Sequence, residues 1–337
     1  MALNYAALDI RGKAVEPILE QIYFSNNTIK NDYVTFNDNI KAGTIFTEAG
    51  VTVTAQLYTG QALTSQGSID VTDRMITPIK LEYKQTFLQE ALRNSRFNTT
   101  MKGGAWEIES SEFGSAVLAQ FGPAISQDAE NMFWSGISAA TKTAIAGLTA
   151  GAGQGSMTAA TQTAVAAMTA TPIDGVISRV LYDQSAVGKY IKVAGTTITS
   201  ANIAAEYAKI YAAIPAEHLA DTLSPVYFYA PRNHRQLMRI ANNSVGAAQQ
   251  INFDFESSAN DSKVFYNGVE IAFVPMPERY VYVQKKDAIS WNTDLVDDIN
   301  KFEVNKLQAD ADVQFVRSIY TLVANVGRAA KGVLYNG

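Results

Sequence analysis

The sequence predicts an α+β fold in which a long β-hairpin precedes one long helix and a mixed helix and strand region follows. Three patterns predict it. Apolar residues alternate with polar ones before residue 85, recur at three- and four-residue steps over 109–137, and form short helix and strand patterns afterwards. With 337 residues, 47% hydrophobic and 18% charged, the chain can bury a sizeable core.

The first segment, residues 1–32, is expected to be an extended or partly helical arm. Ile18, Ile22 and Tyr23 have the spacing of one face of a short helix. Asn26 and the asparagine and aspartate residues after it are expected to break that helix.

Residues 33–85 are expected to form a long, two-armed β-hairpin. Strict alternation of apolar and polar residues is typical of strands with one buried and one solvated face. The alternating residues are Val51, Val53 and Leu57 in the first arm and Ile79, Leu81 and Tyr83 in the second.

The segment between these arms, residues 58–68, is rich in Gly, Ser, Thr and Gln and is expected to form the hairpin tip, which contains Tyr58 and Gln61. An isolated two-stranded ribbon is marginally stable in water. We therefore expect the hairpin to pack against a partner, and the simplest partner is another copy of the same protein.

Two helices are expected next, over 86–98 and over 109–137. In the longer one, Phe121, Ile125 and Phe133 belong to a row of apolar residues at three- and four-residue steps. The Gly122–Pro123 pair predicts a kink or a junction of two consecutive helices. A helix of this size spans roughly 40 Å, which suits an elongated subunit.

Residues 141–171 are dominated by Ala, Thr and Gly, which predicts either a loop region with a small helix or a solvent-facing lobe. Ser200 is expected to cap an amphipathic helix that carries Ile203, Tyr207 and Ile210.

The remaining third of the chain is expected to be rich in strands. Residues 226–229 form a short apolar strand, and Pro231 is expected to begin the helix after it. Asn267–Gly268 between two β-rich runs predicts a tight hairpin. Further strands are expected at residues 280–283, 302–307 and 313–322.

The charge and cysteine content exclude several classes of protein. The formal net charge is −5, from 27 Lys and Arg against 32 Asp and Glu, and no basic stripe is present. A dedicated nucleic-acid binder is therefore not indicated. The chain has no cysteine, so it has no disulfide, thiolate metal site or cysteine nucleophile, which fits a reducing compartment. No secretory signal or membrane-spanning segment is recognised.

Catalytic, cofactor and metal-binding patterns are weak. His218 lies near Glu217 and Asp221, but metal sites need three or four ligands and no HExxH motif is present. His218 is interpreted as the end of a helix, and His234 as a residue on a helix surface. The glycines at 151, 153 and 155 lack the Lys and Ser or Thr of a phosphate loop. No catalytic residue, cofactor or metal is expected, and a hydrolase or metal enzyme that uses either histidine is a rival hypothesis.

Several stretches resemble one family. They are SQDAENMFWSGISAATKTAIAGL at 126–148, SPVYFYAPRNHRQLMRIANN at 224–243, FYNGVEIAFVPMP at 265–277 and KKDAISWNTDLVDDINKFEV at 285–304. Together with the order of the elements, they resemble major capsid proteins of tailed bacteriophages, of the Hong Kong ninety-seven type.

This resemblance implies a fold with an N-terminal arm, an extended loop, a spine helix, a peripheral domain and an axial domain. The implied boundaries are 1–32 for the arm, 33–85 for the extended β-hairpin loop, 86–140 for the peripheral domain with its spine helix, 141–260 for the axial domain, and 261–337 for the return to the peripheral domain and the C-terminal strands.

The resemblance also implies a structural function without enzymatic activity. Pentamers and hexamers would form an icosahedral head that encloses double-stranded DNA without sequence-specific binding, together with scaffolding, portal and decoration proteins. The protein would be located in the virion, after assembly in the host bacterial cytoplasm, and away from membranes. The alternative is an encapsulin-like shell protein of a bacterial nanocompartment, which shares this fold. Residues expected at assembly interfaces are Val51, Val53, Leu57, Tyr58, Gln61, Ile79, Leu81, Ile18, Tyr23, Pro275 and Pro277.

Overall fold

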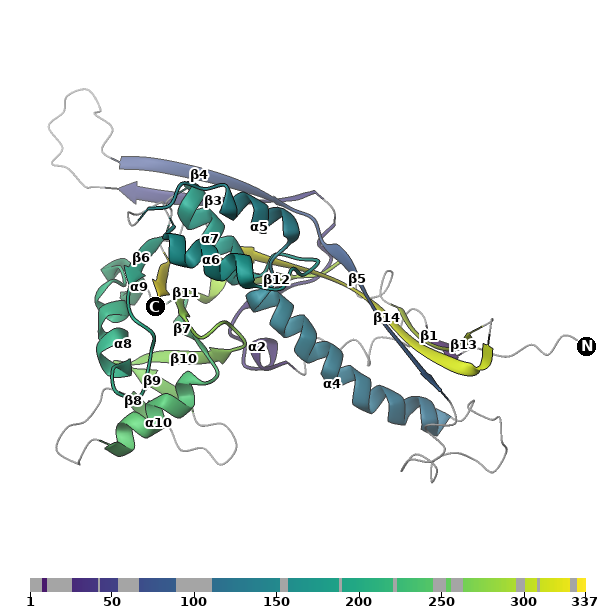
Figure 1. The fold of residues 1–337 in the computed structure, drawn as a ribbon. Helices are drawn as coiled ribbons and strands as arrows, with labels where there is room; N and C mark the ends of the chain where they lie inside the picture. Colours follow the sequence, from purple (N-terminus) through teal and green to yellow (C-terminus); the bar gives the residue numbers. More distant parts are fainter. Residues whose placement is uncertain are drawn as a thin grey trace, which may run out of the picture.

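The molecule is elongated, with a lobe of sheet and helices at one end and a long helix beside a long sheet at the other (Figure 1). The computed structural model describes residues 8–10, 26–41, 43–53, 67–88, 111–151, 157–187, 190–220, 223–244, 253–255, 263–294, 301–307, 310–327 and 332–337.

Helices and strands are mixed along the described chain, which confirms the predicted α+β class. The helices are α2 (Asn27–Lys30), α4 (Ser111–Ser135), α5 (Ala139–Ala146), α6 (Ala159–Ala167), α7 (Val176–Val187), α8 (Ile203–Ala212), α9 (Ala216–Leu219), α10 (His234–Ser244) and the 3-10 turn η3 (Lys286–Ala288). The strands are β1 (Leu8–Ile10), β2 (Thr35–Asn37), β3 (Thr44–Val53), β4 (Gly67–Ile76), β5 (Ile79–Leu88), β6 (Ile191–Ala194), β7 (Val226–Pro231), β8 (Phe253–Phe255), β9 (Val264–Tyr266), β10 (Val269–Val274), β11 (Tyr280–Lys285), β12 (Ile289–Asn292), β13 (Lys301–Leu307), β14 (Asp310–Val326) and β15 (Val333–Asn336).

The lobe of sheet and helices is built on a seven-stranded sheet in the order β6-β15-β11-β7-β10-β9-β8. Alternate residues of a strand point to opposite faces, and both faces of β7 are buried. Phe228 packs with residues of α8 and α10, whereas Tyr229 packs with the core around α4. The ring of Tyr229 lies 5.0 Å from that of Trp134, centroid to centroid. The sheet therefore lies between two layers of helix.

The extended part is a second sheet, in the order β1-β13-β14-β12-β2, with β5 paired to β14. Strand β14 is 17 residues long, and β5 pairs with it from Leu322 opposite Ile79 to Val313 opposite Leu88. Helix α4 packs against this sheet through contacts such as the tilted ring pair of Tyr83 and Phe121, 6.2 Å apart. The long helix and the long sheet thus support each other.

Helix α4 confirms the predicted long helix and runs unbroken through Pro123, so the expected division into two helices is wrong. Its inner face buries Ile125, Ala129 and Phe133 in one core. Pro123 itself is exposed, and the residues that follow it are held in this core, so the helix continues past the proline. Beyond its end, Gly136 accepts a 2.8 Å hydrogen bond from the N–H of Gly175, which brings α4 and α7 into close contact.

The predicted hairpin is present, but its second arm was misassigned. Strand β3 pairs with β4, with Thr44 opposite Ile76 and Val53 opposite Gly67. Residues 79–83 form a strand as predicted, but β5 pairs with β14. Thr86–Leu88 was expected to be helical and belongs to β5 because it continues that ladder; the rest of 86–98 lies outside the described residues.

Three local signals were misread in detail. Asn26 and Asn27 start a helix, because the Asn26 side chain accepts a 2.8 Å hydrogen bond from the N–H of Ile29 and caps α2; the helix expected before Asn26 lies outside the described residues. Asn202 precedes α8, so Ser200 is not its cap. Pro231 is the last residue of β7, and α10 begins three residues later.

Other predictions are confirmed. Asn267 and Gly268 have φ angles of 48° and 81° and form the turn between β9 and β10. The Ala-, Thr- and Gly-rich segment, in contrast, forms two helices, α5 and α6, whose Ile145 and Val165 are buried in the core around α4, so the expectation of a loop with one small helix or a solvent-facing lobe is wrong. The strands expected at 280–283, 302–307 and 313–322 are present within β11, β13 and β14.

Candidate assembly surface

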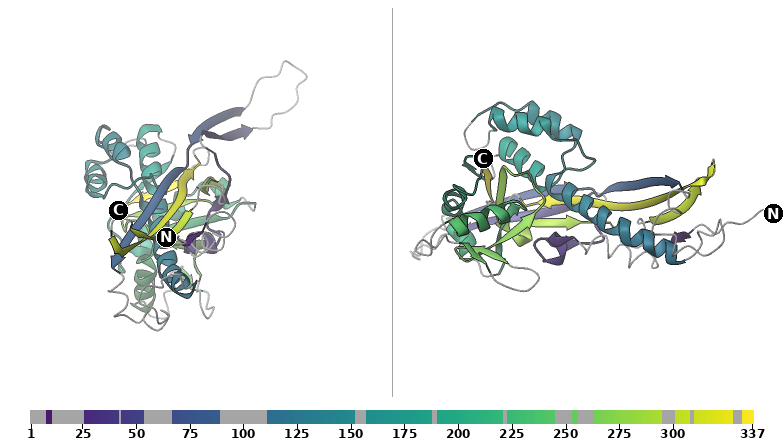
Figure 2. Two further views of the ribbon diagram at one scale, coloured as in Figure 1. Left: turned by 90° about the vertical axis from the view of Figure 1, so that its right-hand side faces the viewer. Right: turned by 60° about the horizontal axis from the view of Figure 1, so that its bottom comes forward.

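The hairpin of β3 and β4 projects from the body of the molecule. Its two strands contact mainly each other, and the left view of Figure 2 shows the ribbon extending away from the sheets. Each strand has ten residues, which corresponds to a length of about 34 Å. A ribbon of this kind has no core of its own on which to fold.

One face of the hairpin, here called the outer face, is apolar and exposed. In an antiparallel pair, residues that lie opposite each other point to the same side. Ile45 lies opposite Met75, and Ile69 and Val71 follow on the same side of β4. The exposed fractions are 61% for Ile45, 69% for Met75, 73% for Ile69 and 57% for Val71. A row of large apolar side chains in water marks an interaction surface.

The opposite face is attached to the body near its base. Ile76 is 2% exposed. The guanidinium of Arg74 forms an ion pair with the fully buried carboxylate of Asp183 on α7 and donates a 2.7 Å hydrogen bond to the carbonyl of Val326. This clamp joins β4, α7 and the end of β14, so it sets the direction in which the hairpin projects.

A cleft of about 370 Å³ adjoins the clamp, between β4 and the helices α5 and α7. Its lining is polar, with three carboxylates, two guanidiniums and one phenol among its groups. The residues are Asp73, Arg74, Met75, Thr141, Asp174, Arg179, Tyr182 and Asp183. Because Asp73 and Met75 also lie on the outer face, the cleft and the apolar row form one continuous surface.

The residues predicted for assembly are only partly placed here. Val51 lies opposite Ile69 and Val53 opposite Gly67 in the hairpin ladder. Ile79 is 40% exposed on β5, whereas Leu81 is 6% exposed and packs in the core. Pro275 and Pro277 lie in the connection from β10 to β11. Leu57, Tyr58, Gln61, Ile18 and Tyr23 lie outside the described residues.

The most exposed members of the row, Ile45, Ile69, Val71 and Met75, were missed at the sequence level. The signal was available, because Ile69, Val71 and Met75 share the two-residue period of a strand with Asp73 between them. The alternation of Ile79, Leu81 and Tyr83 was assigned to the second arm instead, whereas these residues belong to β5, which pairs with β14.

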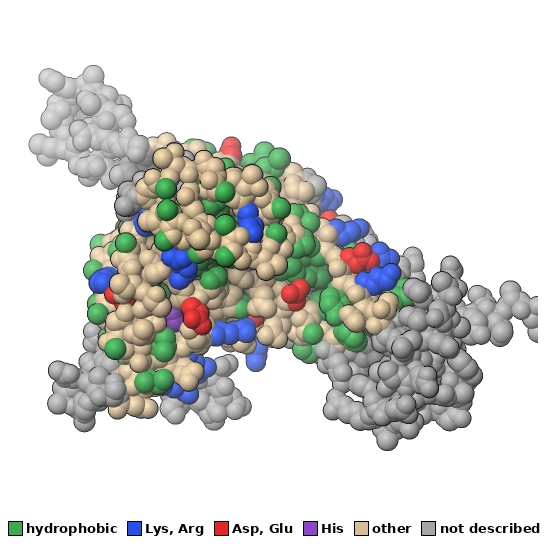
Figure 3. Space-filling model, viewed as in Figure 1, with side chains coloured by type: hydrophobic (Ala, Val, Ile, Leu, Met, Phe, Trp, Pro, Cys, Tyr) green, Lys and Arg blue, Asp and Glu red, His purple; other side chains and the backbone are tan. Residues whose placement is uncertain are grey.

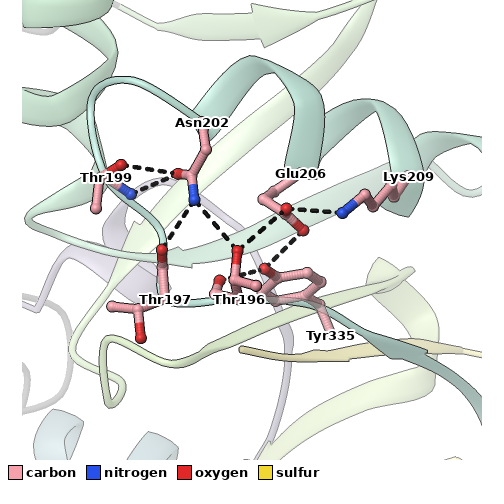
Figure 4. A network of polar contacts seen from close by, with 7 residues as sticks. All are labelled: Thr196, Thr197, Thr199, Asn202, Glu206, Lys209 and Tyr335. Atoms are coloured by element: carbon pink, nitrogen blue, oxygen red, sulfur yellow. Dashed lines mark hydrogen bonds and ion pairs between the residues drawn. The ribbon is translucent and has the colours of Figure 1, made fainter.

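The C-terminal strand is fastened to α8 by a polar network, drawn in Figure 4. The hydroxyl of Tyr335 lies 2.7 Å from the carbonyl oxygen of Thr196 and 2.9 Å from Oε2 of Glu206, so its one proton is shared between these two acceptors. Oε1 of Glu206 also accepts from Lys209 at 2.7 Å. Burial raises the pKa of Glu206, but the hydrogen bonds from Lys209 and Tyr335 outweigh it, so the net pKa is lowered. This polar network therefore has a structural role, which is to hold the C-terminal strand against α8.

His234 was interpreted as a surface residue, and that interpretation is wrong. The side chain is buried at the start of α10, and Nδ1 lies 3.1 Å from the hydroxyl of Tyr207. Burial lowers the pKa of His234 to about 4, against a smaller opposing effect of the backbone at Glu278. The neutral imidazole therefore belongs to the packing of α8 against α10.

Within the described ranges, no three His, Cys, Asp or Glu residues are grouped as metal ligands would be. None of the helices described is both long and apolar enough to cross a membrane.

The fold is similar to that of solved capsid structures over nearly the whole chain. The capsid of a native GTA particle matches with a TM-score of 0.56 and 11% identity, covering 93% of this chain and 91% of that chain. The capsid of an empty GTA particle matches with a TM-score of 0.52 and 14% identity, over 92% and 90%. A structure of Mycobacterium phage Adephagia matches with a TM-score of 0.50 and 9% identity, over 92% and 89%. No protein-family model and no curated protein matches the sequence.

Proposed function

We propose that this chain, which has the major capsid fold of tailed bacteriophages, is a structural shell subunit and not an enzyme. Its copies form pentamers and hexamers, and these close into an icosahedral head around double-stranded DNA. The observation that carries this proposal is the projecting hairpin, which exposes a row of apolar residues and contacts mainly itself.

The energetics of the outer face favour association. Complete burial of one Val, Ile or Met side chain contributes roughly 1.5–3 kcal/mol. Four such side chains are exposed on the hairpin. Partial burial against a neighbour gives a contact of modest strength, and a closed shell contains many copies of it. Modest contacts let misplaced subunits dissociate while the complete shell remains stable.

Each part of the chain is assigned to one region of the shell subunit. In this proposal, residues 1–32 are the arm, 33–85 the extended loop, 86–140 the peripheral domain with α4 as its spine, 141–260 the axial domain, and 261–337 the return to the peripheral domain. The two cores, one around α4 and one around α8 and α10, pack on opposite faces of the seven-stranded sheet. The axial region then gathers around the centre of each pentamer or hexamer.

The enclosed DNA is held without sequence-specific binding, because the net charge of −5 does not favour phosphate contacts. Scaffolding, portal and decoration proteins are further partners in this proposal. The shell subunit belongs to the virion and assembles in the cytoplasm of the host bacterium.

The dependence of assembly on the hairpin provides the test. The double variant Ile69→Lys with Val71→Lys places two charges on the outer face without touching the clamp at Arg74. We expect it to keep the melting temperature of the wild-type protein and to remain as free subunits in sedimentation. A matched control, Thr163→Lys with Ala166→Lys, adds the same charge on exposed positions of α6 and should assemble. Normal shells from the hairpin variant would contradict the proposed role of this surface.

A further inference from the structure

Helix α10 carries two arginines on one flank, outside its buried face. The buried face holds His234 and Met238. Arg235 and Arg239 are four residues apart, so they lie about 6 Å apart along the axis on the same side of the helix. Arg239 is exposed, and the guanidinium of Arg235 lies over the ring of Phe273, 5.9 Å from its centre. The contact with this ring limits the motion of the Arg235 side chain.

Folding brings two further basic residues next to this flank. Arg232, which precedes α10, binds Oε2 of Glu130 at 2.5 Å, and Oε1 of the same carboxylate accepts from the N–H of Thr28. Lys30 follows Thr28 by two residues and is exposed at the end of α2. One carboxylate thus brings the end of α2 close to the start of α10. Figure 3 shows basic side chains gathered over these two helices.

These four residues form a surface that we call the basic patch, made of Lys30, Arg232, Arg235 and Arg239. The acid that pairs with Arg232 is buried, since the side chain of Glu130 is 2% exposed and that of Arg232 is 41% exposed. Asp32 forms an ion pair with Lys286, and Glu278 is exposed near the start of α10. The patch and these described neighbours therefore comprise five basic and three acidic groups, an excess of two positive charges.

The side of the molecule that carries α10 lies opposite α5 and α6 (Figures 1 and 2). The exposed residues of α5 and α6 are alanines and threonines. Lys142, the one basic residue of these two helices, donates a 2.5 Å hydrogen bond to the carbonyl of Met168. Of these two sides, the α10 side is therefore the one that attracts anions.

Duplex DNA fits the basic patch better than an acidic protein segment does. DNA carries one negative charge per about 1.7 Å of helix axis, so a short row of cations meets phosphates at any position along it. A guanidinium has five N–H donors, so Arg232 can bind a phosphate while it keeps its bond to Glu130. An acidic protein segment would have to present its carboxylates at matching positions.

We propose that the basic patch binds phosphate groups of the packaged DNA, and that the α10 side of each subunit lines the inside of the shell. The contact is local, so it is compatible with the net charge of −5 of the whole chain. It is weak in one subunit and is repeated in every copy. This inference rests on the proposed function and names the surface that meets the DNA.

Neutralisation of two patch residues tests the phosphate contact. Lys30→Gln with Arg239→Gln removes two positive charges and leaves the pair of Arg232 and Glu130 intact. We expect free subunits of this variant to bind a labelled DNA duplex about tenfold more weakly at low salt, measured by fluorescence anisotropy. The slope of log affinity against log salt concentration should decrease by about two. Thr163→Glu with Ala166→Glu changes the net charge equally on α6 and should have little effect.

Two results of this titration would overturn the inference. In the first, the wild-type protein binds DNA no better than the patch variant. In the second, polyglutamate binds the wild-type protein more tightly than DNA does and depends on the same two residues, which would assign the patch to an acidic protein segment. Both measurements use free subunits. Electron microscopy of the same proteins shows separately whether shells form, and absence of shells in the wild-type protein would contradict the proposed function instead.

Chemical labelling tests which side of the subunit faces inward. Because the chain has no cysteine, Gln236→Cys on α10 and Thr163→Cys on α6 each introduce a single thiol at an exposed position. A maleimide attached to a polymer too large to enter the shell should label both variants as free subunits and only Thr163→Cys in closed shells. Labelling of Gln236→Cys in closed shells would place α10 on the outside and overturn the inference.

Discussion

Oε1 of Glu130 accepts two hydrogen bonds from Thr28, one from the backbone N–H at 3.0 Å and one from the hydroxyl at 2.6 Å. The indole of Trp134 donates to the same hydroxyl at 2.8 Å, and Arg232 binds the other carboxylate oxygen at 2.5 Å. Residues more than a hundred positions apart are thereby joined in one buried network. The last part of the arm is thus fixed to the long helix by specific polar contacts.

Loss of the Glu130 charge should destabilise the subunit. The variant Glu130→Gln keeps the shape but replaces one acceptor oxygen by a donor and leaves Arg232 without its carboxylate. We expect a decrease of about 2 kcal/mol in the free energy of unfolding, measured by denaturant titration. Glu217→Gln, at an exposed position on α9, is the control and should change little. Equal stability of the two variants would show that the network contributes nothing.

The close approach of α4 and α7 should tolerate no side chain at Gly175. A Cβ there would lie 2.6 Å from the carbonyl oxygen of Met132 and 2.7 Å from that of Phe133. We expect Gly175→Ala to lower the free energy of unfolding by about 1–3 kcal/mol. At Gly147, by contrast, the nearest atoms to an added Cβ are 3.5 Å away and φ is −79°. Gly147→Ala should be neutral or slightly stabilising, and thermal unfolding of both variants checks the contrast.

The burial of His234 predicts a pH dependence. The folded protein keeps this imidazole neutral down to about pH 4, whereas the unfolded chain takes up a proton below about pH 6.5. Unfolding therefore binds a proton in this window, and stability should fall as the pH is lowered from 6.5 to 4, by about 3 kcal/mol from this group. In His234→Gln this slope should be reduced. An unchanged slope between pH 6.5 and 4 would contradict the assignment.

The C-terminal clamp predicts a specific role for one hydroxyl group. Tyr335→Phe removes the donor to Glu206 and Thr196 but keeps the ring. We expect a loss of about 1–2 kcal/mol, because a buried carboxylate loses one of its partners. The effect should be largest above the ordinary pKa of glutamate and shrink as the pH falls through the lowered pKa of Glu206. Tyr211→Phe, in the same core, is the control.

The charge of the chain predicts weak contact with DNA. With 32 acidic and 27 basic residues, free subunits should bind duplex DNA weakly at physiological salt and without sequence preference. Fluorescence anisotropy with labelled duplexes of several sequences checks this. Tight, strongly salt-dependent binding by free subunits would contradict enclosure without specific contact.

Signals that act over a few residues were predicted well from the sequence. The Asn267–Gly268 turn follows from the positive φ angles that these two residue types accept. Helix α4 follows from its apolar period, which a core of Ile125, Ala129 and Phe133 satisfies. Each of these features depends on chemistry that is contained within one stretch of chain.

Features that depend on contacts between distant parts of the chain could not be predicted from the sequence. The alternation at Ile79 and Leu81 identifies a strand but not its neighbour, and the neighbour is β14, more than 200 residues further along the chain. The burial of His234 depends on Tyr207 from a different helix. The clamp between Arg74 and Asp183 also joins separate elements, so the sequence gives no local sign of it.

Copies of this chain should close into a shell, and negative-stain electron microscopy of the purified protein shows whether they do. The protein is imaged alone and after co-expression with the products of neighbouring genes. We expect pentameric and hexameric rings or closed icosahedral shells, with a diameter and nucleic-acid content that separate a phage head from a nanocompartment. A monomer or dimer under every condition would contradict it.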